Sequence, residues 1–195
     1  MARKFDLPYK EDFLLSLQTS NYSPETTYNY ERDLEVFEHF LNQDLKLPFR
    51  NITKRSIELY KAYLTSVDRK TAKSGKAMAR LSAGSINRTL SSLRRYLAYL
   101  IDMDYTSPIA PEAVKLLKMP RRHPRVAEFE ALVRLIESPN EFERSKSVAL
   151  RNRAILETLF STGMRISELV SLNRDQIDKT GRIFIRGKGK KERFV

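Results

Sequence analysis

The chain has 195 residues, enough for one domain and part of another, or for two small domains. Its 36 Lys and Arg residues outnumber the 24 Asp and Glu residues, which gives a net charge of +12, and 41% of its residues are hydrophobic. This charge favours an anionic partner, with nucleic acid ahead of an acidic membrane, and the hydrophobic content argues against a disordered basic tail.

Several classes of protein are excluded by what the sequence lacks. It contains no cysteine, which rules out disulfide frameworks and thiolate metal sites. Met1 to Pro8 lacks the apolar segment of a signal peptide, and no apolar run reaches the length of a membrane-spanning helix. We therefore expect a cytoplasmic protein without a membrane partner.

The N-terminal part of the sequence predicts three amphipathic helices. Ser23-Pro24-Glu25 is a typical helix start, with Ser as N-cap, Pro at the first helical position and Glu in the first turn. Thr53 is the expected N-cap of the third helix. The apolar positions follow helical spacing: Phe13, Leu14 and Leu17, then Tyr30, Leu34, Phe37 and Leu41, then Ile57, Tyr60 and Leu64.

A basic stretch from Arg69 to Ile101 contains no acidic residue. Its first half, up to Gly84, is expected to be a mobile loop, and its second half a helix that starts around Ser85. At about 100° per residue, one side of this helix is apolar and the opposite side is cationic and polar. The apolar side holds Ile86, Leu90, Leu93, Leu97 and Ile101, and the polar side holds Asn87, Arg88, Ser91, Arg94 and Arg95.

The polar side of this helix carries the groups that contact with DNA requires. Basic side chains suit phosphates, while Asn and Ser reach sugars or base edges. An ordinary solvated helix face is the alternative. The predicted DNA-binding residues in this stretch are Lys73, Lys76, Arg80, Ser85, Asn87, Arg88, Ser91, Arg94 and Arg95.

Residues 106–125 are expected to be a linker between an N-terminal domain, residues 1–105, and a second domain, residues 126–195. Four prolines interrupt any long helix in this segment, and its remaining charge is strongly basic. The positive charge of this segment suits a nucleic-acid partner, so we add Arg121 and Arg122 to the predicted DNA contacts. A plain interdomain linker is equally compatible with this composition.

The second domain is expected to open with an apolar helix and a loop over residues 137–147. A further apolar helix then ends at Gly163, which accepts the left-handed conformation. Arg165 follows in the first turn of the next helix, where the helix dipole normally favours an acid. An anion bound at this point explains the arginine. A surface ion pair with Glu168 or Glu157 is the alternative.

A basic turn, Gly187-Lys188-Gly189-Lys190-Lys191, lies near the end of the sequence. It follows an alternating run over residues 182–186 and precedes the apolar pair Phe194-Val195. This pattern is typical of a β-hairpin tip.

The chain closely resembles the tyrosine recombinases, also called the phage-integrase family, and the Xer-type enzymes in particular. The resemblance rests on two motifs in the same order, Ser161-Thr162-Gly163-Met164-Arg165-Ile166-Ser167-Glu168-Leu169 and Gly187-Lys188-Gly189-Lys190-Lys191-Glu192-Arg193. It extends to the helix start at Ser23 and to the basic helix, so it covers nearly the whole chain. It implies a mainly α fold, with an N-terminal helical core-binding (SAM-like) domain and an incomplete α+β catalytic domain that has a small β-hairpin.

The resemblance also implies a reaction and roles for residues. In this family a tyrosine hydroxyl attacks a DNA phosphodiester and forms a 3′-phosphotyrosine, so the bond energy is kept and no cofactor or metal is needed. Arg165 is then the first of two arginines that clamp the phosphate, which suits a planar guanidinium. Lys188 is the general acid, with Lys190 or Lys191 as alternatives, and Glu168 supports Arg165. Lys190 is also a predicted DNA contact.

Other parts of that active site have no counterpart in this sequence. The family's second arginine, its histidines and its nucleophilic tyrosine lie beyond the hairpin, whereas no tyrosine follows Tyr105 and no histidine follows His123. We therefore predict a recombinase truncated before its catalytic tyrosine, which does not cleave DNA alone. The partners implied are double-stranded DNA with a specific recombination site and sister subunits, which form a tetramer on two DNA sites.

Three functions remain compatible with the sequence. The first is site-specific recombination, either Xer-like resolution of chromosome or plasmid multimers or integration by a phage or mobile element. The second is that of a catalytically inactive half-recombinase that only binds DNA. The third is that of a basic helical RNA-binding or scaffold protein, which predicts no preference for duplex DNA and no effect of losing Arg165.

Overall fold

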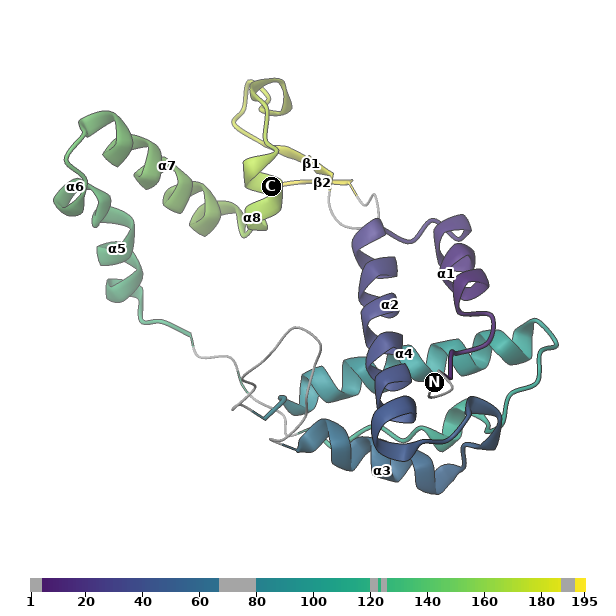
Figure 1. Ribbon diagram of the computed structural model, residues 1–195. Helices are drawn as coiled ribbons and strands as arrows, with labels where there is room; N and C mark the ends of the chain where they lie inside the picture. The colour runs from purple at the N-terminus through teal and green to yellow at the C-terminus, as the bar shows by residue number, and fades with distance from the viewer. Residues whose placement is uncertain (1–4, 67–79, 120–122, 124–125, 187–191) are drawn as a thin grey trace. The chain divides into compact units, whose positions relative to one another are not determined.

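A computed structural model describes residues 5–66, 80–119, 123, 126–186 and 192–195 of the chain. The chain divides into two compact units, Met1–Arg121 and Arg122–Val195. Both are mainly helical (Figure 1), and each has its own buried apolar cluster. None of the helices in the described ranges combines the length and the hydropathy that a membrane crossing requires.

The first unit is an assembly of helices joined by short turns. Its helices are α1 (Lys10–Thr19), α2 (Pro24–His39), α3 (Lys54–Thr65) and α4 (Ala83–Asp102). One π-helical turn continues α2, and two 3₁₀ turns follow in the chain: η1 (Phe40–Leu45), η2 (Phe49–Asn51) and η3 (Pro111–Ala113).

Side-chain caps fix the starts of three helices in this unit. Ser23 Oγ accepts a hydrogen bond from the backbone N–H three residues further on, at 3.2 Å, and Thr53 Oγ1 does the same at 3.4 Å. α4 begins at Ala83, slightly before the predicted start, because Ser82 is its N-cap and accepts from the N–H of Ser85 at 3.1 Å. These caps satisfy N–H groups that a first turn leaves without partners.

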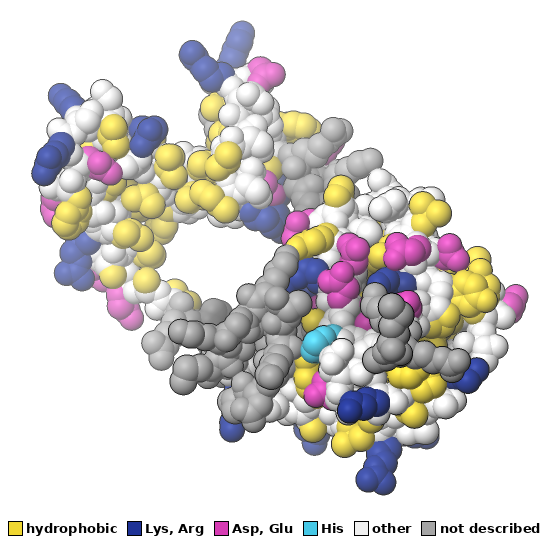
Figure 2. All heavy atoms as spheres, viewed as in Figure 1, with side chains coloured by type: hydrophobic (Ala, Val, Ile, Leu, Met, Phe, Trp, Pro, Cys, Tyr) yellow, Lys and Arg dark blue, Asp and Glu magenta, His cyan; other side chains and the backbone are white. Residues whose placement is uncertain are grey.

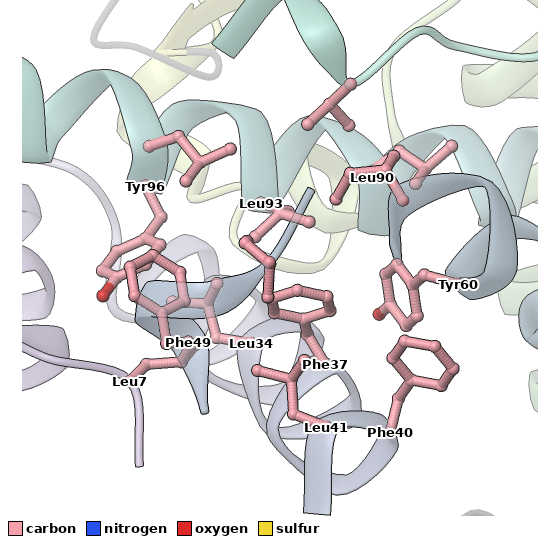
Figure 3. Packing of buried hydrophobic residues seen from close by; sticks show 14 of the residues in the cluster. Leu7, Leu34, Phe37, Phe40, Leu41, Phe49, Tyr60, Leu90, Leu93 and Tyr96 are labelled. Atoms are coloured by element: carbon pink, nitrogen blue, oxygen red, sulfur yellow. The ribbon is translucent and has the colours of Figure 1, made fainter. Parts of the chain in front are cut away.

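The core of the first unit forms where α4 packs against α2 and α3. Leu90, Leu93 and Tyr96 are at most 1% exposed. Figure 3 shows Leu93 pointing from α4 toward Phe37, whereas Tyr96 points toward Phe49, whose ring centroid lies 5.8 Å from its own. The rings of Phe37 and Tyr60 meet edge to face, with centroids 4.8 Å apart, which is a favourable arrangement for aromatic side chains. The apolar faces predicted from helical spacing therefore meet in one cluster.

The predicted apolar face of α4 is wrong at Ile101, which is 47% exposed. Tyr96 and Leu100 are fully buried instead. The buried arc of the helix is therefore rotated toward these two residues, and Ile101 falls outside it in the last turn.

Part of the segment expected to be a linker packs on the first unit. Val114 is 0% exposed and belongs to the core of this unit, and Ile109 and Leu117 pack against that core. These apolar contacts hold the segment on the first unit, although its proline and basic residues predict an interdomain linker. The first unit accordingly extends well beyond residue 105.

The second unit combines helices with one two-stranded sheet. Its elements are α5 (Phe129–Glu137), α6 (Pro139–Phe142), α7 (Lys146–Thr162), α8 (Ile166–Val170), η4 (Arg174–Gln176), β1 (Phe184–Arg186) and β2 (Glu192–Phe194). β1 and β2 are antiparallel, with Ile185 opposite Arg193, as the predicted hairpin requires. Residues 137–147 differ from the expected loop because they include the short helix α6, which has a proline at its first position.

The second unit buries little apolar surface. Its buried cluster consists of Met164, Ile183 and Ile185, with four partly buried neighbours. No residue of α5 is buried, and side chains such as Phe129 remain 64% exposed. Figure 2 shows hydrophobic side chains on the surface of this unit.

Candidate functional site

The site predicted from the sequence lies where α7 ends and α8 begins. Gly163 ends α7 with a φ of 61°, the left-handed conformation predicted for it. Arg165 is the N-cap residue of α8 and not a member of its first turn, because the helix begins at Ile166. Glu168 is the third residue of α8, so the helix has the acid that its dipole favours in the first turn.

The carboxylate of Glu168 is buried, at 8% exposed, and accepts four hydrogen bonds. Arg165 donates from its backbone N–H to Oε2 at 2.8 Å and from Nη1 to Oε1 at 2.9 Å. Arg193, on β2, donates from Nη1 to Oε1 at 3.1 Å and from Nη2 to Oε2 at 2.8 Å. The acceptor capacity of the carboxylate is thus filled by two arginines.

These contacts keep Glu168 ionised despite its burial. The hydrogen bond from Arg193 is the largest influence, followed by the backbone N–H of Arg165, and together they lower the pKa of Glu168 to about 2. Glu168 in turn raises the pKa of Arg193. One negative and two positive charges leave this cluster net positive, as an anion site requires.

Arg165 remains accessible although it is paired. Its side chain is 61% exposed, and a guanidinium has five N–H donors, so the single bond from Nη1 leaves donors for an anion. The surface ion pair with Glu168 that the sequence left open is present, whereas Glu157 pairs with Arg153 at 2.8 Å. The pair orients Arg165 and uses one of its guanidinium nitrogens, and its phosphate-binding and catalytic role stays a prediction.

α4 carries the predicted basic face on the surface of the first unit. Ser91, Arg94 and Arg95 are exposed, and so is Arg80, which precedes the helix. Ser85 is half-buried in the first turn of α4, with its hydroxyl 2.9 Å from that of the N-cap serine. Most of the predicted face is therefore accessible, and its contacts with DNA stay a prediction.

Arg88 is paired with an acid that the sequence pattern did not reveal. Asp33, on α2 and 4% exposed, lies 2.9 Å from Arg88 Nη2. The same carboxylate accepts hydrogen bonds from Thr89 Oγ1 at 3.2 Å and from Ser92 Oγ at 2.7 Å. The absence of acids from residues 69–101 indicated a face without a counter-charge, and this interpretation is wrong at Arg88, because its acid comes from a different helix. Its signal in the sequence is a charged residue on the apolar side of α2.

Asn87 is engaged within the first unit. Its Nδ2 donates to the carbonyl oxygen of Leu117 at 3.0 Å, and its Oδ1 accepts from the N–H of Leu117 at 2.7 Å. The whole side-chain amide is thus bonded to the backbone of one residue and ties the segment after α4 to that helix. This geometry favours a structural role for Asn87 over the DNA contact predicted for it.

Several predicted site residues lie outside the described residues, and their roles stay predictions: Lys73, Lys76, Arg121, Arg122, Lys188 and Lys190. In the part of the chain that the structure describes, no three His, Cys, Asp or Glu side chains gather as the ligands of a metal ion do.

Two protein-family models match most of the chain. Residues 11–103 match the family model of the phage integrase N-terminal SAM-like domain, and residues 125–195 match that of the phage integrase family. The chain belongs to the phage integrase family of tyrosine recombinases. The resemblance seen in its two motifs is confirmed, and so is the mainly α fold with a SAM-like domain and a small hairpin.

Relatives named tyrosine recombinase XerC match most of the chain. The protein of Listeria innocua is 32% identical over 179 residues, which cover 90% of this chain and 54% of that protein. The protein of Myxococcus xanthus is 33% identical over 174 residues, with 89% and 53% covered. For Lactobacillus delbrueckii subsp. bulgaricus the identity is 30% over 189 residues, with 95% and 59% covered. The chain thus spans about half the length of these relatives.

A solved structure shares the fold. The XerH site-specific recombinase, crystallised with its difH substrate as a pre-cleavage complex, superposes with a TM-score of 0.62 and 21% identity. The match covers 90% of this chain and 49% of that chain.

Replacement of Asp33 with asparagine is expected to destabilise the first unit by about 1–3 kcal/mol. Burial raises the pKa of Asp33, and Ser92, Arg88 and Thr89 oppose this by binding the charged form. An amide has no charge with which to form the ion pair, and one of the two acceptor oxygens is replaced by an NH₂ donor where three donors already converge. Urea denaturation followed by circular dichroism measures the change. Glu35→Gln, at an exposed position of the same helix, is the control. If both variants have an equally small effect on stability, Asp33 is not the group that holds α4 against α2.

The carboxyl group of Glu168 is expected to titrate near pH 2 in a ¹³C NMR titration of the chain. Because the folded-state pKa lies below the ordinary value of 4.5, the stability that this group contributes is fully present above about pH 4.5. That stability disappears as the pH falls toward 2. A midpoint at or above 4.5 would show that the two arginines do not hold the carboxylate.

Proposed function

We propose that this chain is part of a Xer-type site-specific recombinase, in which Arg165 binds the DNA phosphate that is cut and rejoined. The observation that supports this most is an exposed arginine fixed by a buried carboxylate, in a chain of the phage integrase family. The relatives named XerC support the Xer type. A phage or mobile-element integrase is the second candidate, because the same motifs serve both.

The reaction proposed is a transesterification. A tyrosine oxygen forms a bond to phosphorus as the bond to the 5′ oxygen breaks, which leaves a 3′-phosphotyrosine and a free 5′-hydroxyl. Negative charge develops on the non-bridging oxygens, and a guanidinium that stays protonated offers them parallel N–H groups. Glu168 holds one edge of the Arg165 guanidinium, so little reorganisation is needed when the phosphate arrives. Lys188 donates the proton to the leaving oxygen.

The first unit supplies affinity for the duplex in this proposal. The exposed basic side chains of α4 neutralise phosphates. Arg88 can donate hydrogen bonds to a phosphate, but its charge is already offset by Asp33. The partners are double-stranded DNA with a specific recombination site and sister recombinase subunits, four on two sites. That the XerH site-specific recombinase was crystallised bound to its difH substrate supports the first of these. The proposed role is resolution of chromosome or plasmid multimers in the cytoplasm.

Replacement of Arg94 and Arg95 with glutamine is expected to weaken binding of the chain to a fluorescent DNA duplex. For every phosphate that is no longer neutralised, the slope of log affinity against log salt should become shallower by about 0.9. Fluorescence anisotropy at several salt concentrations measures both quantities. Lys54→Gln with Arg55→Gln removes the same charge from exposed positions of α3. Equal effects of both double variants would show that binding follows net charge and not the α4 face.

Replacement of Arg165 with alanine is expected to weaken duplex binding by about threefold to tenfold, because the variant cannot form one charged hydrogen bond to a phosphate. Arg174→Ala, at an exposed position of η4 in the same unit, is the control and should have little effect. Duplex RNA of the same sequence serves as competitor. No change with Arg165→Ala, together with equal competition by RNA, would favour the RNA-binding or scaffold alternative.

A further inference from the structure

Arg193 meets the same carboxylate as the candidate phosphate-binding arginine. It lies on β2, 25 residues after Glu168, and is opposite Ile185 of β1 in the antiparallel register. Its guanidinium binds both oxygens of the Glu168 carboxylate, at 3.1 Å and 2.8 Å, and its side chain is 37% exposed. Two parallel hydrogen bonds between these planar groups fix orientation as well as distance.

We propose that Arg193 is a positioning residue for Arg165 and acts through Glu168. The proposal rests on the phosphate-binding role of Arg165 stated above. Each oxygen of the carboxylate is shared by the two arginines: Oε1 accepts from both Nη1 atoms, and Oε2 accepts from the Arg165 backbone N–H and from Arg193 Nη2. The plane that Arg193 imposes on the carboxylate therefore sets the direction in which the Arg165 guanidinium is held.

The local structure around Arg165 makes such an external support necessary. α8 has only five residues, and a helix of this length is not stable by itself. The terminal torsion of a glutamate side chain is broad. Without Arg193, the Glu168 carboxylate would be held only by its two bonds to Arg165, the residue that it orients. β2 is a firmer support, because Val195 and Ile183 exchange two backbone hydrogen bonds, at 2.9 Å and 3.0 Å, and Ile183 is buried beside Met164.

The geometry favours positioning over direct contact of Arg193 with DNA. Both terminal nitrogens of Arg193 are bonded to Glu168, whereas Arg165 uses only Nη1 of its guanidinium in that pair. Arg193 is also less exposed than Arg165, at 37% against 61%. Arg182, which directly precedes the buried Ile183, pairs instead with Asp178 at 2.9 Å, so it provides a matched control.

The test uses the full chain with Arg193→Lys, which keeps the charge and removes the two-point fork. The pKa of Glu168 should rise above about 2 in a ¹³C NMR titration, because its largest stabilising hydrogen bond is weakened. Arg182→Lys should leave that pKa unchanged. An unchanged pKa of Glu168 in Arg193→Lys would overturn the proposal.

A double-mutant cycle on DNA affinity tests the link to Arg165. In the wild-type chain Arg165→Ala should weaken duplex binding by about threefold to tenfold. In the Arg193→Lys background the same substitution should weaken binding by less than about twofold. The reason is that a misaligned Arg165 guanidinium already contributes little to binding, so its removal costs little. An equal cost in both backgrounds would overturn the positioning role and leave the proposed function intact. No cost in the wild-type chain would remove the phosphate-binding role of Arg165, and the positioning role with it.

A second variant keeps the test decisive if Arg193→Lys disturbs the hairpin. Amide exchange of Ile183 and Val195, whose N–H groups join the two strands, reports on that pairing. Where those amides exchange faster, Glu168→Gln replaces Arg193→Lys in the cycle, since it removes the shared charge at nearly the same side-chain shape. The cost of Arg165→Ala should again fall below about twofold, and a cost equal to that in the wild-type chain would overturn the proposal.

Discussion

The Glu168 carboxylate joins three parts of the second unit: the start of α8, the side chain of Arg165 and the strand that carries Arg193. A buried charge is costly unless hydrogen bonds satisfy it, and here four donors do so. The apolar cluster of this unit is small. The polar junction therefore holds the short α8 against the hairpin together with the apolar contact of Leu169, and it fixes one end of the exposed Arg165 guanidinium.

The first unit uses a buried carboxylate for a different purpose. Asp33 binds Arg88, Thr89 and Ser92, which lie within about one turn of α4. Apolar packing tolerates a small roll of a helix, whereas three directional contacts to one carboxylate do not. Asp33 thus fixes the rotation of α4 about its axis, and with it the direction in which the basic side chains beyond the core are exposed.

Local signals in the sequence predicted much of this fold, because they depend on neighbouring residues. Ser23 and Thr53 cap helices, Gly163 takes its left-handed conformation, and the two expected strands pair as a hairpin. The contacts that were missed join residues far apart in the chain, such as Asp33 with Arg88 and Glu168 with Arg193. An acid-free stretch says nothing about acids on a neighbouring helix. In the same way, the prolines and basic residues around Val114 predicted a linker, and the packing of Val114 in a core formed by distant residues was missed.

The two units also suit two different demands that a recombinase makes on its cations. Affinity for a duplex comes from many mobile charges and depends little on their exact direction, which an exposed helix face on a well-packed core can supply. Stabilising charge on one phosphate requires a fixed guanidinium, since catalytic benefit falls off steeply with misplacement. A face of exposed arginines cannot provide that precision. A carboxylate shared by two arginines can, because the arginine on the strand fixes the carboxylate and the carboxylate fixes the other guanidinium.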